Sequence, residues 1–120
     1  MDKKILKNTS KNTTLGEVRF ANTFFSRFRG LMLKKDLNDG GLVLEIPAGR
    51  GRSGSAIHMF FMRISLDIIF TDENLKIVDI ATCNPWTMYT PREAARNVIE
   101  LEVGTVERSN TEIGDVLEYQ

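Results

Sequence analysis

The sequence predicts a mainly β protein, a single compact β-barrel-like or sandwich-like domain with one or two short helices. The chain has 120 residues, which is enough for one domain with its own core and too few for two ordinary ones. Apolar residues make up 42% of the chain and charged residues 27%, which is typical of globular proteins and excludes disordered and collagen-like classes. Short apolar segments follow one another with turn residues between them, the pattern of small all-β domains.

The amino-terminal part predicts one strand and one helix. Residues 15–21 alternate as a strand does, and the single β-rich domain is placed at 15–120. Segment 1–14 before it has room for an extra strand. A helix is expected next, because apolar residues recur at helical spacing behind a capping residue at 22 or 23; they are Phe24, Phe28, Leu31 and Met32.

The middle of the chain predicts three strands and a loop. Residues 42–46 form an apolar strand that Pro47 ends. The run 49–54 is rich in glycine and arginine and is predicted to be a mobile loop. Segments 56–62 and 66–70 are apolar at alternate and intervening positions, so we expect them to form a hairpin with both faces covered.

The last third predicts three more strands. A turn at 72–74 leads to a strand at 75–81, and a short strand at 116–119 ends the domain. Between them, Thr90 and Glu93 have the spacing of a capping box, which predicts one helical turn. Residues 97–103 also alternate cleanly, with one set facing the core and the other facing away; the sets are Ile99, Leu101 and Val103 against Glu100 and Glu102.

The counts of cysteine, histidine and charge exclude several classes of site. Cys83 is the only cysteine and His58 the only histidine, which excludes an internal disulfide, a multi-cysteine zinc site and a multi-histidine metal centre. No cofactor and no metal are therefore predicted. The net charge is zero, so no nucleic-acid partner is expected.

The charges are unevenly distributed along the chain. Residues 1–60 hold eleven Lys and Arg against five Asp and Glu, and residues 61–120 hold five against eleven. Either the two halves pack together and neutralise each other, or a basic face attracts an anionic partner.

The amino-terminal residues 1–11 are basic, but no apolar run of signal-peptide length follows them. No stretch approaches the roughly 20 apolar residues of a membrane helix. These features predict a soluble, cytoplasmic protein with no membrane partner.

Four motifs, in this order, carry a specific resemblance. They are RFRGLM at 27–32, HMFFM at 58–62, LDIIF at 66–70, and VIELEVGT at 98–105 followed by Gly114-Asp115. Together they resemble the family called domain of unknown function 192 over residues 15–119. The sequence IHMFF at 57–61 is similar to the corresponding motif of its archaeal members. The resemblance implies a compact, mainly β fold with no established activity. The chain departs from the family pattern at Ser65, where the family has proline, and at 41–44, where an aromatic residue is missing.

Asp67 is the first candidate for a functional residue. A carboxylate between Leu66 and Ile68 in an apolar strand is costly unless it is paired or hydrogen-bonded. It either accepts backbone N–H groups or an arginine and locks the hairpin, or it serves as a ligand-binding or general-base group. Glu100 is a possible second carboxylate for acid–base hydrolysis, although such a residue more commonly faces solvent or an arginine.

The remaining candidates each have a structural alternative. His58 and Cys83 would need to be neighbours to act as a nucleophile pair, whereas a lone histidine in an apolar strand is usually a core residue. Trp86 lies in an irregular segment and is expected to be partly exposed.

Our leading hypothesis is a non-catalytic domain that binds a small polar ligand or a segment of a partner protein. Asp67 and Arg29 would orient the ligand, and aromatic and methionine side chains would supply contact area. The full set of candidate ligand-binding residues is Arg27, Arg29, His58, Phe61, Met62, Asp67 and Trp86. A hydrolase that uses Asp67 and Glu100 is the first alternative, and it requires both carboxylates in one cleft. A structural or protein-interaction module with an exposed apolar patch is the second.

Overall fold

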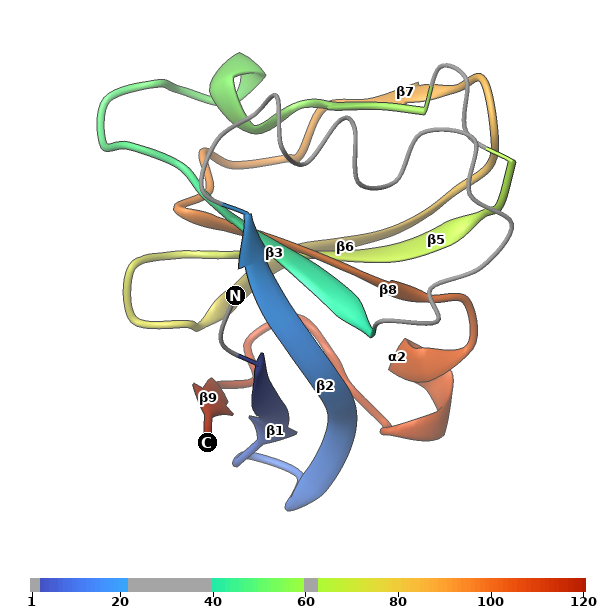
Figure 1. Cartoon of the computed structure of the whole chain (residues 1–120). Helices are drawn as coiled ribbons and strands as arrows, with labels where there is room; N and C mark the ends of the chain where they lie inside the picture. The colour runs from blue at the N-terminus through green and yellow to red at the C-terminus, as the bar shows by residue number, and fades with distance from the viewer. Residues whose placement is uncertain (1–2, 22–39, 60–62) are drawn as a thin grey trace.

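A seven-stranded sheet curls into a half-barrel in this computed structural model, which describes residues 3–21, 40–59 and 63–120 (Figure 1). The strand order is β6-β5-β8-β3-β2-β1-β9, and β2 with β3 is the parallel pair. The strands are β1 (Lys3–Asn8), β2 (Thr13–Ala21), β3 (Gly41–Glu45), β5 (Leu66–Thr71), β6 (Ile77–Cys83), β8 (Asn97–Glu102) and β9 (Leu117–Tyr119). The predicted mainly β fold is confirmed.

Smaller elements cover and close the sheet. A two-stranded ribbon of β4 (Ile57–His58) and β7 (Met88–Tyr89) lies over one face, together with a 3-10 turn (Ser53–Ser55) (Figure 1). A short helix, α2 (Thr105–Arg108), follows β8. The helix expected from Phe24 onward lies outside the described residues.

The two edge strands of the sheet meet at one point. Lys76, just before β6, forms an antiparallel bridge with Val116, just before β9. The Ile77 N–H donates to the Asp115 carbonyl and the Leu117 N–H to the Leu75 carbonyl, each at 2.9 Å. Segment 1–14 contributes β1, which pairs with both β2 and β9. The amino-terminal strand β1 and the carboxy-terminal strand β9 are therefore both part of the sheet, and the bridge joins its two edges.

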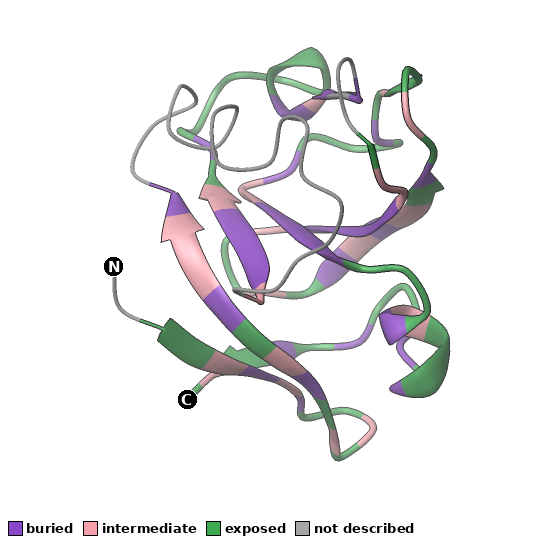
Figure 2. Cartoon of the chain, turned by 45° about the vertical axis from the view of Figure 1, so that its right-hand side comes forward, coloured by how far each residue is buried: buried purple, intermediate pink, exposed green. Residues whose placement is uncertain are grey.

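The central strands are buried on both faces, so the domain has two cores. All six residues of β5 are buried, as its apolar character predicted (Figure 2). One core lies inside the curl, among Leu6, Val18, Val43, Ile69, Ile77, Ile99, Leu101 and Leu117. The other lies between the sheet and the covering segments, among Leu42, Ile57, Met59, Leu66, Ile68, Phe70, Ala95 and Val98.

The predicted hairpin of segments 56–62 and 66–70 is wrong. The strand β5 already has β6 on one side and β8 on the other, so neither of its edges is open to β4. Instead, Ile57 pairs with Tyr89 and His58 with Met88 in the separate ribbon. Periodicity indicated the strand at 66–70 correctly, whereas of 56–62 only Ile57–His58 form a strand in the described structure and 60–62 lie outside the described residues. The pairing depended on segments farther along the chain.

The helical turn predicted from Thr90 and Glu93 is also absent from the described structure, where 91–96 form bends. The Arg92 N–H donates to Asp79 Oδ2 at 2.9 Å, and the Tyr89 hydroxyl donates to the same oxygen at 2.6 Å. The buried Asp79 carboxylate on β6 therefore accepts the Arg92 N–H group, which in a helix would be bonded to the capping residue. These hydrogen bonds hold segment 89–92 against the sheet.

The predicted loop at 49–54 has no strand structure, and part of it is tied down. The Arg52 Nε donates to the Pro91 carbonyl at 2.8 Å, and the 3-10 turn begins at the next residue. This contact joins the loop to the segment that Asp79 anchors.

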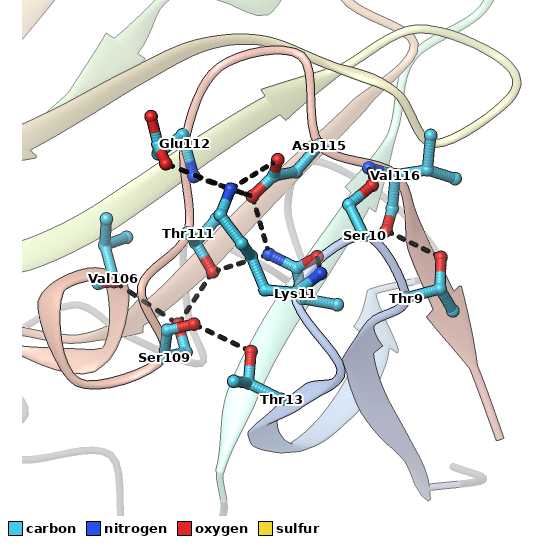
Figure 3. A network of polar contacts seen from close by, with 11 residues as sticks. Thr9, Ser10, Lys11, Thr13, Val106, Ser109, Thr111, Glu112, Asp115 and Val116 are labelled. Atoms are coloured by element: carbon cyan, nitrogen blue, oxygen red, sulfur yellow. Dashed lines mark hydrogen bonds and ion pairs between the residues drawn. The ribbon is translucent and has the colours of Figure 1, made fainter.

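A buried polar network fastens the turn between β1 and β2 to the carboxy-terminal segment (Figure 3). Asp115 accepts hydrogen bonds from Asn8 Nδ2 at 2.9 Å, from Lys11 Nζ at 2.8 Å and from the Glu112 N–H at 3.0 Å. Asn8 also donates to Thr111 Oγ1 at 3.1 Å. A basic residue from the first half of the chain thus neutralises an acidic one from the second.

We expect Asp115→Asn to lower the free energy of unfolding at neutral pH by about 1–3 kcal/mol, because the charged hydrogen bonds are lost. Burial alone would raise the pKa of Asp115, but the donors from Asn8, Lys11 and Glu112 outweigh burial and lower it below its usual 3.8. The stability that the charge contributes is therefore present above pH 3.8 and is lost as the pH falls further, through the lowered pKa of the folded state.

Urea unfolding of the wild type and the Asp115→Asn variant between pH 7 and pH 2.5 tests this prediction. The gap between them should stay constant down to about pH 4 and then close. The control is Glu112→Gln, since Glu112 is exposed and pairs with the same lysine; it should change stability by less than about 0.5 kcal/mol. A gap that does not depend on pH would contradict the assigned role of the Asp115 charge.

Candidate functional site

Asp67 joins the start of β5 to the segment around α2. The residue is 4% exposed, and its Oδ1 accepts a hydrogen bond from the Thr82 hydroxyl on β6 at 2.9 Å. Its Oδ2 accepts the N–H groups of Gly104 at 3.0 Å and Val106 at 3.1 Å. The prediction that Asp67 accepts backbone N–H groups is confirmed, although it holds the α2 segment and not the predicted hairpin.

The sequence around α2 explains why a distant carboxylate is needed. Gly104 occupies the N-cap position with φ of 97°, a conformation that residues with a side chain rarely adopt, and it has no side chain to cap the helix. The first N–H groups of a helix lack partners within the helix. Asp67 supplies the missing acceptor from a neighbouring strand, and this fixes the turn against the sheet.

A pocket of about 330 Å³ opens beside this carboxylate. Its wall combines hydrogen-bonding groups with two valine side chains; the lining residues are Asp67, Thr82, Val103, Gly104, Val106, Glu107, Asn110 and Thr111. Val103 was expected in the core but is 48% exposed, because the chain turns away from the sheet directly after β8. Thr111 connects the pocket to the buried network of Asn8 and Asp115.

Asp67 and Glu100 project from opposite faces of the sheet. In the register of β5 with β8, Asp67 lies opposite Leu101, whereas Ile68 lies opposite Glu100. Glu100 therefore shares the face that is covered by the β4–β7 ribbon, and it is fully buried. Of the two alternatives expected for it, solvent or an arginine, the first is wrong. Two carboxylates separated by the sheet cannot act on one bond, and the predicted pair does not form a catalytic site.

The other predicted ligand-binding residues are only partly placed. Arg27, Arg29, Phe61 and Met62 lie outside the described residues. The backbone of His58 lies in β4 and pairs with Met88. Trp86 is 60% exposed, as expected, but it does not line the Asp67 pocket.

Cys83, at the end of β6, is 4% exposed and packs in the core under the covering segments. Burial, together with the charge of Glu100, raises the pKa of its thiol to about 11. A thiolate is the reactive form of cysteine, so this environment suppresses nucleophilic chemistry at neutral pH.

Most of the pocket wall was not predicted from the sequence. Glu107 and Asn110 belong to a segment without clear periodicity, and Val103 ends an alternating strand that predicted it in the core. They line the same pocket as Asp67 after the chain turns at Gly104. The one local signal was that glycine directly after an alternating strand, which is typical of a turn.

We expect Asp67→Asn to lower the free energy of unfolding by about 1–3 kcal/mol, because an amide has one acceptor oxygen where the carboxylate uses two. Thermal denaturation measures this loss, and Glu102→Gln at the exposed end of β8 is the control, with an expected change within about 0.5 kcal/mol. An Asp67→Asn variant as stable as the wild type would contradict the anchoring role.

We also expect Cys83 to react with Ellman's reagent about 100-fold more slowly in the native protein than in denaturant, since its pKa rises from 9.0 to about 11. The reaction rate at pH 8 with and without denaturant provides the measurement. Rapid modification of the folded protein would show that the thiol is accessible and activated.

Comparison with known proteins places the chain in a family. Residues 5–119 match the family of domain of unknown function 192, described as "Uncharacterized ACR". A UPF0127 protein of Pyrococcus horikoshii is 42% identical over 113 residues, which cover 93% of this chain and 96% of that protein. A UPF0127 protein of Thermococcus sibiricus is 40% identical over 116 residues, 97% of this chain and 74% of that protein. Both relatives are archaeal proteins.

Two solved structures share the fold. A proposed transcription regulator from Sinorhizobium meliloti has a TM-score of 0.81 and 26% identity, covering 98% of this chain and 94% of that chain. A protein of unknown function from Novosphingobium aromaticivorans has a TM-score of 0.72 and 23% identity, covering 97% and 83%. Within the described part of the chain, no helix has the length and apolar character needed to cross a membrane. The match over nearly the whole sequence, with the half-barrel around Asp67, shows that the chain belongs to the domain of unknown function 192 family.

Proposed function

We infer that this domain binds a small polar ligand in the Asp67 pocket and does not transform it. The observation that carries the proposal is a fixed carboxylate in the wall of a pocket of about 330 Å³, a volume at the lower end of the range for small-molecule sites. Three protein donors hold Asp67 in one orientation, as an oriented binding group requires.

The acceptors in the pocket indicate the chemistry of the ligand. An ionised carboxylate has about four acceptor positions, and the three donors leave about one of them for a ligand. Glu107, Asn110 and the threonine hydroxyls add further oxygen acceptors, and none of the lining residues that the structure describes is basic. The wall therefore suits a ligand that presents hydroxyl or amino donors, with a small apolar part against Val103 and Val106.

The experiment is a thermal-shift screen with monosaccharides, polyols, amino acids, nucleosides and short amines. A ligand present at 100 times its dissociation constant stabilises the native state by about 2.7 kcal/mol, which raises the melting temperature by several degrees. We expect a hit among the hydroxyl- or amino-bearing compounds.

Two matched tryptophan variants locate the site of any hit. Val103→Trp places a large side chain at a pocket wall position that is 48% exposed, and it should abolish the shift. Ile113→Trp makes the same kind of change at a position that is 47% exposed and does not line the pocket, so the shift should persist. A shift that survives in Val103→Trp, or a screen without any hit, would overturn the proposed function.

A further inference from the structure

The segments that cover the core between the sheet and the β4–β7 ribbon carry an excess of arginine. These segments, 46–59, 63–65 and 84–96, form what we call the arginine layer, which lies above the sheet in Figure 1. They contain five cationic side chains and one acidic one, Glu93; the cations are Arg50, Arg52, Arg63, Arg92 and Arg96. The net charge of zero for the whole chain therefore conceals a local charge of +4 in the described part of this layer.

Two of the three segments of the arginine layer, 46–59 and 84–96, are hydrogen-bonded side by side. Arg52 Nε donates to the Pro91 carbonyl at one end. The β4–β7 ribbon forms the middle, and the Trp86 N–H donates to the Met59 carbonyl at 2.7 Å beyond it. From Pro91 to Trp86 the chain spans no more than about 18 Å.

Two of the five arginines have a carboxylate partner among the residues that the structure describes. The Nε of Arg92 lies 3.6 Å from Asp79, and Arg96 lies 3.3 Å from Glu73. Among the residues that the structure describes, no carboxylate lies within ion-pair distance of Arg50, Arg52 or Arg63. All three are exposed, so their charge faces solvent.

Two large apolar side chains are exposed within the same layer. Trp86 and Met88 are each 60% exposed, and they are the most exposed large apolar residues of the described chain. Trp86 also has φ of 66°, a backbone conformation that is unfavourable for a bulky residue. Trp86 belongs to segment 84–96 of this layer.

We propose that the arginine layer binds single-stranded nucleic acid, with arginines contacting phosphates and Trp86 stacking on a base. Guanidinium groups bind phosphate through paired donors, and this layer uses arginine at every cationic position. An exposed aromatic ring beside a basic track is the arrangement that single-strand binders use, and it is tolerant of base sequence. This site is distinct from the Asp67 pocket, which is lined by oxygen acceptors.

Fluorescence provides a direct test because Trp86 is the only tryptophan of the chain. The intact protein is titrated with oligo-uridine and oligo-thymidine at about 50 mM NaCl, and stacking on Trp86 should quench its emission. Labelled oligonucleotides give the affinity by anisotropy, and titrations at increasing NaCl give the salt dependence. Duplex DNA, polyglutamate and anionic phosphatidylserine vesicles are titrated in parallel.

Matched charge variants separate local binding from general attraction. Arg50→Gln with Arg63→Gln removes two exposed cations from the arginine layer, and it should reduce the slope of log affinity against log salt by about 1.4. Lys3→Gln with Lys4→Gln removes the same charge from the exposed start of β1 and should leave the slope unchanged. Trp86→Ala should weaken binding about 5- to 100-fold, as expected for the loss of one stacked base.

The outcomes distinguish the possible partners. Quenching by single strands, together with a selective effect of the arginine variant, supports the proposal. Binding to vesicles or polyglutamate in preference to single strands would overturn it and assign the layer to a different anionic surface. Equal effects of the two double variants, or no binding to single strands at about 50 mM NaCl, would also overturn it. Melting temperatures of all variants confirm that they are folded.

Discussion

The antiparallel register between β5 and β8 is the constraint on which the rest of this structure depends. It places Asp67 opposite Leu101 and Ile68 opposite Glu100, and so decides which side chains enter which core. A slip of one residue would exchange the two faces and move Asp67 away from its donors at α2. Because both faces are buried, such a slip would leave polar groups without partners on one side and apolar groups displaced on the other. The register is therefore maintained by burial on both sides.

Three buried aspartates then attach the loops to this frame, each by accepting several hydrogen bonds. Asp67 holds the α2 segment, Asp79 holds the segment at 89–92, and Asp115 holds the turn between β1 and β2. Hydrogen bonds to an ionised carboxylate are stronger than neutral ones, and one carboxylate can satisfy several donors at once. The two proposed binding surfaces are both built on segments that these aspartates anchor. Both proposals therefore place a binding surface on a segment that a buried aspartate holds in position.

Strand positions were predicted from the sequence more accurately than the contacts between segments. The strands expected at 15–21, 42–46, 66–70 and 97–103 are present within a few residues of the structural bounds, because alternation of apolar residues is a local property. The hairpin of 56–62 with 66–70 failed because periodicity identifies an apolar face and does not identify the neighbouring strand. The capping box at Thr90 failed because Asp79, distant in sequence, accepts the Arg92 N–H. In the candidate site, Asp67 was recognised as a costly carboxylate in an apolar strand, whereas the loop that completes the pocket had no comparable signal.

The sequence by itself determined the β class, most strand positions and the family, since apolar periodicity and the order of motifs can be read along the chain. Only the tertiary structure decided that Asp67 and Glu100 lie on opposite faces, since that depends on the pairing of two strands separated in sequence. It also decided that the arginines of two separate segments share one surface, while the net charge of the whole chain is zero. Residue identity sets which interactions are possible. Long-range pairing brings the residues together, and it arises from contacts that no local pattern contains.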